Sequence, residues 1–190
     1  MRWSTSNRAD PAGKRIADQH YNRQTPDSAQ FAPPGRCLVF VAEAGGTATA
    51  LWVSTAQEYS LHAWGGAWIN STFRNEGAGL SSELITEAVA ATRAAWGDPP
   101  PLGFVTFIDE SQVRHKRDPG RCYRKAGWCL ARCPKHLERE EGCAACRSRT
   151  VGGLLVLQLA PERFPAPELP RQGQAGLFTA SGSASGVRSG

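Results

Sequence analysis

Short apolar runs alternate with polar loops through the middle of the chain, and their spacing predicts several strands and one long helix. Residues 37–42 and 47–54 are strand-like runs joined by Gly45 and Gly46, which can adopt the positive φ of a tight hairpin turn, so we expect them to pair antiparallel. Further strands are predicted over 67–73, over 103–108, which is apolar enough to be central, from Trp128, and over 152–159.

The most regular helical pattern covers residues 80–96, where apolar side chains recur every three or four positions. Ser81 or Ser82 is placed to cap its start, Glu83 lies in the first turn, and Gly97 follows its end. A short helix is expected over about 119–126. This order of elements predicts an α+β fold with a mixed, mostly antiparallel central sheet and helices on both faces.

The composition divides the 190 residues into one domain with two polar ends. Residues 1–14 are expected to be a flexible lead-in, 15–162 the folded domain, and 163–190 a disordered tail rich in Pro, Gly and Ser. The longest apolar run, 151–160, is shorter than the roughly 20 residues that cross a bilayer, and no apolar leader follows Met1. We therefore expect no membrane span and a cytoplasmic location.

Positive charge is concentrated in residues 112–149, which hold eleven Lys or Arg against four acidic residues. Such a segment attracts polyanions, either nucleic acid or the phosphates of a nucleotide cofactor. A solvated loop that happens to be basic is the alternative. The residues assigned to nucleic-acid binding are Arg114, Lys116, Arg117, Arg121, Arg124 and Lys125.

Five of the six cysteines lie within residues 122–146, where a C-x2-H-x6-C-x2-C pattern indicates a metal site. Three thiolates and one imidazole complete a tetrahedral structural zinc site in an insertion at about 129–149. Cys129 competes with His136 for the fourth position, and unliganded thiols in a surface loop are the alternative. The expected ligands are Cys133, His136, Cys143 and Cys146.

An R-x-x-G-x-G sequence at residues 74–79 lies between a predicted strand and the start of the long helix. Backbone N–H groups at such a place form an anion site that suits a pyrophosphate. The alternative is a strand-to-helix turn that simply needs small residues.

This loop, the helix, the next strand and residues 122–128 together resemble the core of the GNAT acyltransferases, over about residues 37–160. The resemblance implies acetyl-CoA or another acyl-CoA as donor, and strands 67–73 and 103–108 that splay to admit pantetheine. It also implies Tyr123 as the general acid for the leaving thiolate. The cofactor-binding residues that it assigns are Arg74, Asn75, Glu76, Gly77, Ala78, Gly79 and Leu80.

A narrower resemblance, over about residues 15–130, is to the phage Mom proteins, a GNAT-like family that modifies the exocyclic amine of adenine in phage DNA and so blocks restriction enzymes. It rests on His20-Tyr21 followed by Arg23 and Pro26, on Ser82 at the head of the long helix, and on segments 106–109 and 120–128. Glu83 stands where the family has arginine. The catalytic residues implied are His20, Tyr21, Ser82, Asp109 and Tyr123.

Each assigned residue also has a structural interpretation. Asp109 is a base or amine-orienting group, or it caps the following turn; Tyr123 is an acid or a packed aromatic. Ser82 is a helix cap that can also act in the site. The aromatic residues Trp64, Trp68, Phe73 and Trp128 offer flat surfaces for a flipped base, or belong to the core.

The favoured function is therefore transfer of an acyl-type group to an exocyclic amine of double-stranded DNA, with adenine as the expected base and an anti-restriction role in a bacterial host. One alternative is an acetyl-CoA-dependent N-acetyltransferase of a small molecule or protein, which the intact glycine loop favours. The other is a non-catalytic nucleic-acid-binding module on a GNAT scaffold. The identity of the transferred group, a contribution from iron and the oligomeric state stay open at this stage.

Overall fold

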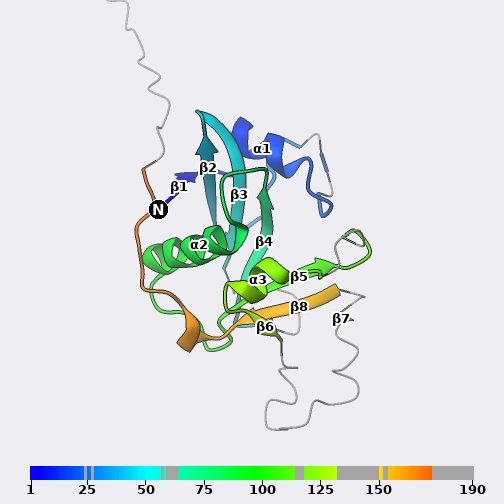
Figure 1. Ribbon diagram of the computed structural model, residues 1–190, viewed down its shortest axis with the longest axis vertical. Coiled ribbons are helices and arrows are strands. Elements are labelled where there is room, and N and C mark those ends of the chain that lie inside the picture. The colour runs from blue at the N-terminus through cyan, green and yellow to red at the C-terminus, as the bar shows by residue number, and fades with distance from the viewer. Residues whose placement is uncertain are drawn as a thin grey trace, which may run out of the picture.

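The computed structural model describes residues 1–23, 25–26, 28–56, 58, 64–113, 118–131, 150–151 and 154–172. These residues form an eight-stranded sheet in the order β1-β2-β3-β4-β5-β8-β6, with β7 paired to β8 (Figure 1). The strands are β1 (Trp3–Ser6), β2 (Cys37–Ala44), β3 (Thr47–Thr55), β4 (Trp68–Asn75), β5 (Phe104–Asp109), β6 (Cys129–Leu130), β7 (Thr150–Val151) and β8 (Leu154–Leu159). The helices are α1 (Pro11–Ala17), α2 (Ser81–Trp96), α3 (Arg121–Lys125) and a 3-10 turn at Pro161–Arg163.

Apart from the parallel pair β4 and β5, all neighbouring strands in the described sheet pair antiparallel, so the predicted α+β class and mostly antiparallel mixed sheet are confirmed. The β2–β3 hairpin is also confirmed. Gly45 and Gly46 have φ values of 59° and 77°, the left-handed pair that a tight two-residue hairpin turn requires. None of the described helices is long and apolar enough to cross a membrane.

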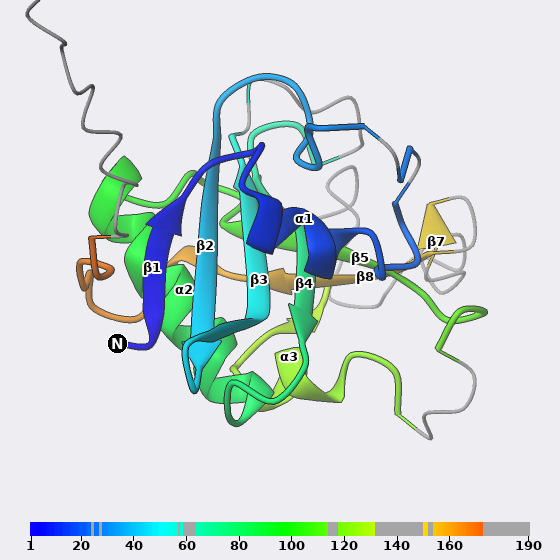
Figure 2. The same ribbon diagram turned by 90° about the horizontal axis from the view of Figure 1, so that it is seen from above.

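The central strands are buried on both faces, because α1 and α2 cover opposite sides of the sheet (Figure 2). Successive side chains of a strand point to opposite faces. On β3, Trp52 accordingly packs with Leu84 of α2, whereas Leu51 and Val53 pack with Ile16 of α1. The predicted placement of helices on both faces is therefore confirmed.

The long helix begins and ends as expected, but its start is capped differently. Gly97, with φ 87°, follows Trp96 and donates its N–H to the Arg93 carbonyl. The N-cap is Leu80, with no side-chain hydrogen bond, so the expectation that Ser81 or Ser82 caps the helix is wrong. Both serines lie within the first turn, which leaves their hydroxyl groups available for other contacts.

The N-terminal segment belongs to the fold, which contradicts the expectation of a flexible lead-in over residues 1–14. β1 pairs antiparallel with β2 over four residues, and the fully buried Trp3 donates its indole N–H to the Leu84 carbonyl at 2.8 Å. Asp10 caps α1 by accepting the Ala12 N–H at 3.0 Å. Trp3 is the one buried residue of β1. The other residues of this strand are at least partly exposed, so they can be polar.

The first ten residues of the expected disordered tail, 163–172, are also part of the fold. Phe164 is buried in the same core as α2, and the Arg171 N–H donates to the Trp3 carbonyl at 2.9 Å. The Arg171 carbonyl in turn accepts the Thr5 N–H at 3.0 Å, so this segment covers part of the outer edge of β1. The expectation is therefore wrong for residues 163–172, and residues 173–190 lie outside the described residues.

β4 and β5 pair over three positions only and then separate, as Figure 1 shows. The last paired residues are Asn70 and Thr106; beyond them β4 continues along β3 and β5 continues along β8. Ser71 is an extra residue in β4, since Ser54 pairs with Asn70 but Val53 pairs with Thr72, and such a bulge bends the strand that contains it. The sheet consequently opens in the middle.

Candidate functional site

A cleft of about 840 Å³ lies where β4 and β5 separate, and it is lined from both faces of the sheet. Four of the five residues assigned to catalysis line it: His20, Tyr21, Ser82 and Tyr123. Arg74, Asn75 and Leu80 of the glycine loop line it too. The lining segments are 19–22 after α1, 70–75 of β4, 80–82 at the start of α2, 106–108 of β5, and 112–113, 118–123 and 125 around α3.

Tyr123 is buried, and its hydroxyl donates to Asn70 Oδ1 at 2.6 Å. Its ring makes edge contacts with Phe73 and Trp128, at centroid distances of 6.0 and 5.2 Å. Burial raises the pKa of Tyr123 well above its usual value, because the charged phenolate is poorly solvated there. The residue is therefore a neutral phenol at pH 7.

His20 and Tyr21 form a stacked pair on the other side of the opening, with ring centroids 4.5 Å apart and planes inclined by 30°. Asn22 joins this pair to the sheet, because its Oδ1 lies 2.5 Å from His20 Nδ1 while its Nδ2 donates to the Ser71 carbonyl at 2.7 Å. Burial lowers the pKa of His20, so its imidazole is neutral at pH 7.

This lowered pKa predicts a pH dependence of stability. Unfolding returns the pKa of His20 to about 6.5, so below that pH the unfolded chain takes up the proton first and the free energy of unfolding falls. A His20→Gln variant should lose less stability than the wild type between about pH 6.5 and about pH 5 in urea unfolding. The lowered pKa values of Asp18, hydrogen-bonded by Lys14, and of Glu76, hydrogen-bonded by Arg74, act only at more acidic pH. Equal losses in both proteins would contradict the assignment.

The loop that carries the stacked pair is held by Arg23, whose side chain is only 9% exposed. Its guanidinium donates to the Asp18 carboxylate at 2.7 Å and to the carbonyls of Ser28 and Gln30 at 2.8 and 3.1 Å, with a longer contact to Pro26 at 3.3 Å. The sequence identified Arg23 only as part of a motif. No local pattern indicates that one side chain ties together a turn of this length.

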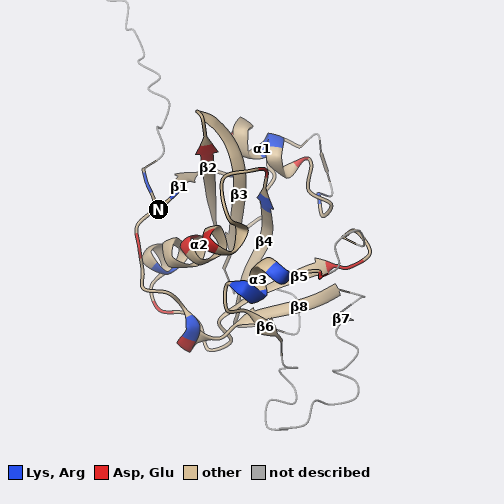
Figure 3. Ribbon diagram, viewed as in Figure 1, with Lys and Arg blue, Asp and Glu red and all other residues tan. Residues whose placement is uncertain are grey.

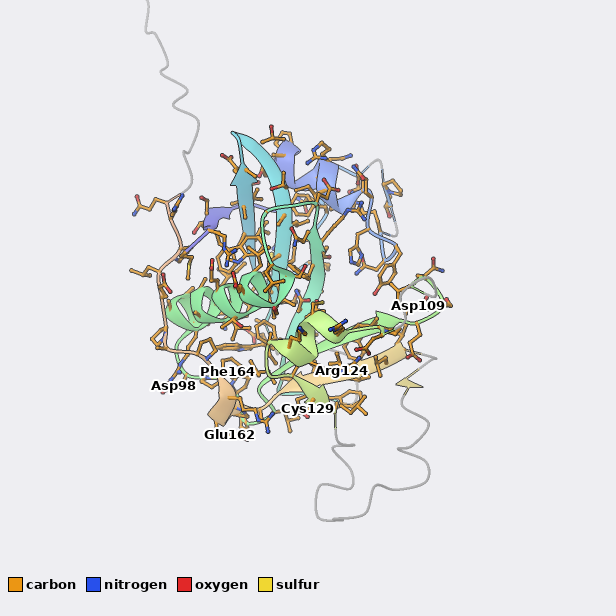
Figure 4. All side chains as sticks on the ribbon, viewed as in Figure 1. Asp98, Asp109, Arg124, Cys129, Glu162 and Phe164 are labelled. Atoms are coloured by element: carbon orange, nitrogen blue, oxygen red, sulfur yellow. The ribbon has the colours of Figure 1, made fainter. Side chains whose placement is uncertain are left out.

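Asp109 does not line the cleft, and its carboxylate is engaged in the turn that follows β5 (Figure 4). Its Oδ1 accepts the Ser111 N–H at 2.9 Å and the Ser111 hydroxyl at 2.5 Å. The backbone N–H of Asp109 lies 3.4 Å from the Tyr21 hydroxyl oxygen, at the edge of the site. This geometry matches the turn-capping interpretation of Asp109 rather than a base facing the substrate.

The glycine loop satisfies part of its own backbone, so its N–H groups are not all available to an anion. The Thr49 carbonyl accepts the Glu76 N–H at 2.6 Å, and Asn75 Oδ1 accepts the N–H groups of Gly77 and Ala78 at 3.0 and 2.9 Å. In the described part of the chain, no acceptor faces the N–H groups of residues 80–82. The available donors are thus displaced from the expected residues 76–80 toward the N-terminus of α2.

Two cations of α3 line the cleft. Figure 3 shows basic residues on α3. Arg121 and Lys125 are exposed, and neither has an ion-pair partner in the described ranges, whereas Arg124 pairs with Asp118. Arg74 on β4 is neutralised by Glu76 at 2.8 Å. Of the predicted nucleic-acid-binding residues, Arg114, Lys116 and Arg117 lie outside the described residues.

The predicted zinc ligands Cys133, His136, Cys143 and Cys146 lie outside the described residues, so the zinc site stays a prediction. Cys129 is exposed, and its Sγ accepts a hydrogen bond from Arg163 at 3.0 Å. No group of three or more His, Cys, Asp or Glu side chains within the described ranges is arranged to hold a metal ion.

The aromatic residues considered for base stacking divide between core and cleft. Trp64, Trp68 and Trp128 are buried in the core, as the alternative interpretation expects. Phe73 lines the cleft, as do His20 and Tyr21. The flat surfaces available to a ligand therefore come mainly from the loop after α1.

Comparison with family models, with curated proteins and with solved structures gives no match.

Proposed function

We propose that the protein transfers an acyl-type group from an acyl-CoA to an exocyclic amine of a DNA base. The observation that carries this proposal is the separation of β4 from β5, because the resulting opening joins the two faces of the sheet in one cleft. A donor and an acceptor can then reach the same point from opposite faces, which is the arrangement that group transfer requires.

The face with α2 and α3 suits the donor. The N–H groups of residues 80–82 and the positive end of the 16-residue helix α2 suit the pyrophosphate of CoA. The pantetheine chain would then extend between β4 and β5 toward Tyr123, as the resemblance to the GNAT core implies.

The face with the loop after α1 suits the acceptor. Tyr21 is 41% exposed and stacks on His20, so the pair offers a flat surface on which a base can lie. The base must leave the duplex to lie on this surface, because its neighbours in the stack cover both of its faces. The resemblance of the His20-Tyr21 segment to Mom supports this choice of substrate.

In the proposed reaction the amine nitrogen attacks the carbonyl carbon of the thioester. The C–N bond forms, the C–S bond breaks, the thiolate leaves, and the amine loses one proton. An exocyclic amine is a weak nucleophile, so most of the acceleration comes from holding it against the carbonyl. The residues of the loop after α1 supply that positioning.

An N-acetyltransferase of a small molecule or protein would use the same donor site. Arg121 and Lys125, which have no ion-pair partner among the described residues, favour a polyanionic acceptor over a neutral small amine. Mass spectrometry of nucleosides from bacteria that produce the protein distinguishes the two. The proposal expects an adenine adduct with the wild-type protein and far less of it with Arg23→Ala, whereas unmodified nucleosides together with turnover of acyl-CoA on small amines would favour the alternative.

DNA binding supplies a separate prediction. An Arg121→Gln, Lys125→Gln double variant should lower the slope of log affinity against log salt by about 2, since each lost phosphate contact removes about one unit. Arg124→Gln is the matched control on the same helix, because Arg124 already pairs with Asp118. Titrations with a fluorescent duplex at several salt concentrations measure the slopes. A double variant with the wild-type slope would show that these cations do not contact phosphate.

A further inference from the structure

The side-chain amide of Asn70 has only one orientation that satisfies its surroundings. Asn70 is buried, with 4% of its surface exposed. Its Nδ2 donates to the carbonyls of Val53 and Thr72, at 3.1 and 3.0 Å. Exchange of the oxygen and nitrogen would place Oδ1 against two carbonyl oxygens, which can only accept. The atom that faces Tyr123 is therefore Oδ1.

This orientation determines the direction of the Tyr123 proton. Because Oδ1 can only accept, the Tyr123 hydroxyl must donate in the 2.6 Å contact, and a phenol has one proton to donate. Thr106 approaches the same Oδ1 at 3.4 Å and the Asn70 carbonyl at 3.3 Å as a further donor. The phenol oxygen keeps only the ability to accept a hydrogen bond.

We infer that Asn70 is a positioning residue, which turns the Tyr123 hydroxyl away from the reacting groups so that the phenol oxygen accepts an N–H of the substrate amine instead of protonating the leaving thiolate. The inference rests on the proposed function and refines the chemistry of that site. It replaces the role of general acid that the GNAT resemblance assigns to Tyr123.

Protonation of the leaving thiolate by Tyr123 would be unfavourable on two grounds. A Tyr123 hydroxyl turned toward the thiolate would leave the buried Asn70 Oδ1 without its 2.6 Å partner. Burial also raises the pKa of Tyr123 well above 10, whereas a thiol has a pKa of about 8.5. Transfer of the proton from this phenol to a thiolate is therefore uphill.

The acceptor role specifies the kind of amine. One N–H of a primary amine donates to Tyr123, which orients the nitrogen toward the thioester carbonyl. As the C–N bond forms and the C–S bond breaks, the second N–H proton passes to water and the thiolate leaves as an anion. A primary exocyclic amine, as in adenine, meets both requirements.

The first test measures the pKa of Tyr123 in the full-length protein, with tyrosine labelled by ¹³C at Cζ. The chain has three tyrosines, so Tyr123→Phe assigns the signal. Asn70→Ala should lower the pKa of Tyr123, because it removes the acceptor that stabilises the neutral phenol. Thr106→Val is the matched control, because it removes a long hydrogen bond to the same Asn70 amide but keeps the acceptor of the Tyr123 hydroxyl, so it should not lower that pKa. An unchanged or raised pKa in Asn70→Ala would overturn the inference.

Asn70→Ala leaves two carbonyls without donors and can fail to fold, so the wild-type hydroxyl proton supplies a second readout. The inference expects a Tyr123 hydroxyl proton that exchanges slowly with water and shows a nuclear Overhauser effect to Asn70. A rapidly exchanging hydroxyl proton would contradict it.

The third test changes the leaving group. It distinguishes a Tyr123 that accepts a hydrogen bond from the amine from a Tyr123 that protonates the thiolate. Tyr123→Phe should slow transfer about tenfold, the effect of one hydrogen bond to the reacting amine. The loss should be the same with an acyl-CoA and with an aryl thioester whose thiol has a lower pKa. A loss that disappears with the aryl thioester would identify Tyr123 as the acid and overturn the inference. If the wild type transfers no group at all, the proposed function fails, while the NMR titration still decides the role of Asn70.

Discussion

An Arg23→Ala variant should transfer its acyl group about 100-fold more slowly than the wild type, because a misplacement of about 1 Å at a reacting group has an effect of this size. Arg23 is 9% exposed and connects the Asp18 carboxylate to the carbonyls of Ser28 and Gln30, so its loss releases the loop that carries His20 and Tyr21. Single-turnover kinetics with saturating donor measure the effect.

Arg15→Ala is the matched control for this variant. Arg15 lies in the preceding helix and pairs with Glu76, but its side chain is 46% exposed. We expect Arg15→Ala to retain a rate within about threefold of the wild type, because an exposed ion pair is worth at most about 1 kcal/mol. Equal rates for Arg23→Ala and the wild type would show that the loop after α1 takes no part in the reaction.

The largest expected effect on stability comes from Trp3→Ala, which should lower the free energy of unfolding by about 3–5 kcal/mol. Trp3 is fully buried against α2, and its indole donates to the Leu84 carbonyl, so the truncation leaves a cavity and removes a buried hydrogen bond. Guanidinium unfolding followed by circular dichroism measures the change.

Trp96→Ala provides the comparison, because Trp96 contacts Trp68 at 5.3 Å but is only partly buried. Its effect should be clearly smaller than that of Trp3→Ala. A Trp3→Ala effect below about 1 kcal/mol would mean that the N-terminal strand adds little to the domain.

The elements with local signals could be predicted from the sequence. The hairpin follows from Gly45 and Gly46, and the long helix follows from its apolar spacing and from Gly97 at its end. β1 could not be predicted, because its single core residue, Trp3, is recognisable only when β2 is beside it. The segment around Arg171 is likewise ordered through the edge of β1 rather than through its own composition.

In the candidate site, too, residues in local motifs could be predicted, whereas contacts that depend on the fold could not. Ser82, Tyr123 and the two ends of the glycine loop are found by motif and do share one cleft, whereas Glu76, Gly77, Ala78 and Gly79 do not line it. The sequence gives no sign that Asn75 occupies the N–H groups of Gly77 and Ala78, because that depends on the loop's three-dimensional path. The sequence also gives no sign of the orientation of the Asn70 amide, because that orientation depends on carbonyls from two neighbouring strands.

If the donor binds in the opening between β4 and β5, CoA alone should bind there. Amide chemical shifts of the ¹⁵N-labelled protein should be followed as CoA is added. We expect one saturable change that includes the amides of residues 80–82 and of Tyr123, which lie at the start of α2 and in α3. No change at these amides at saturating CoA, or changes confined to distant residues, would contradict it.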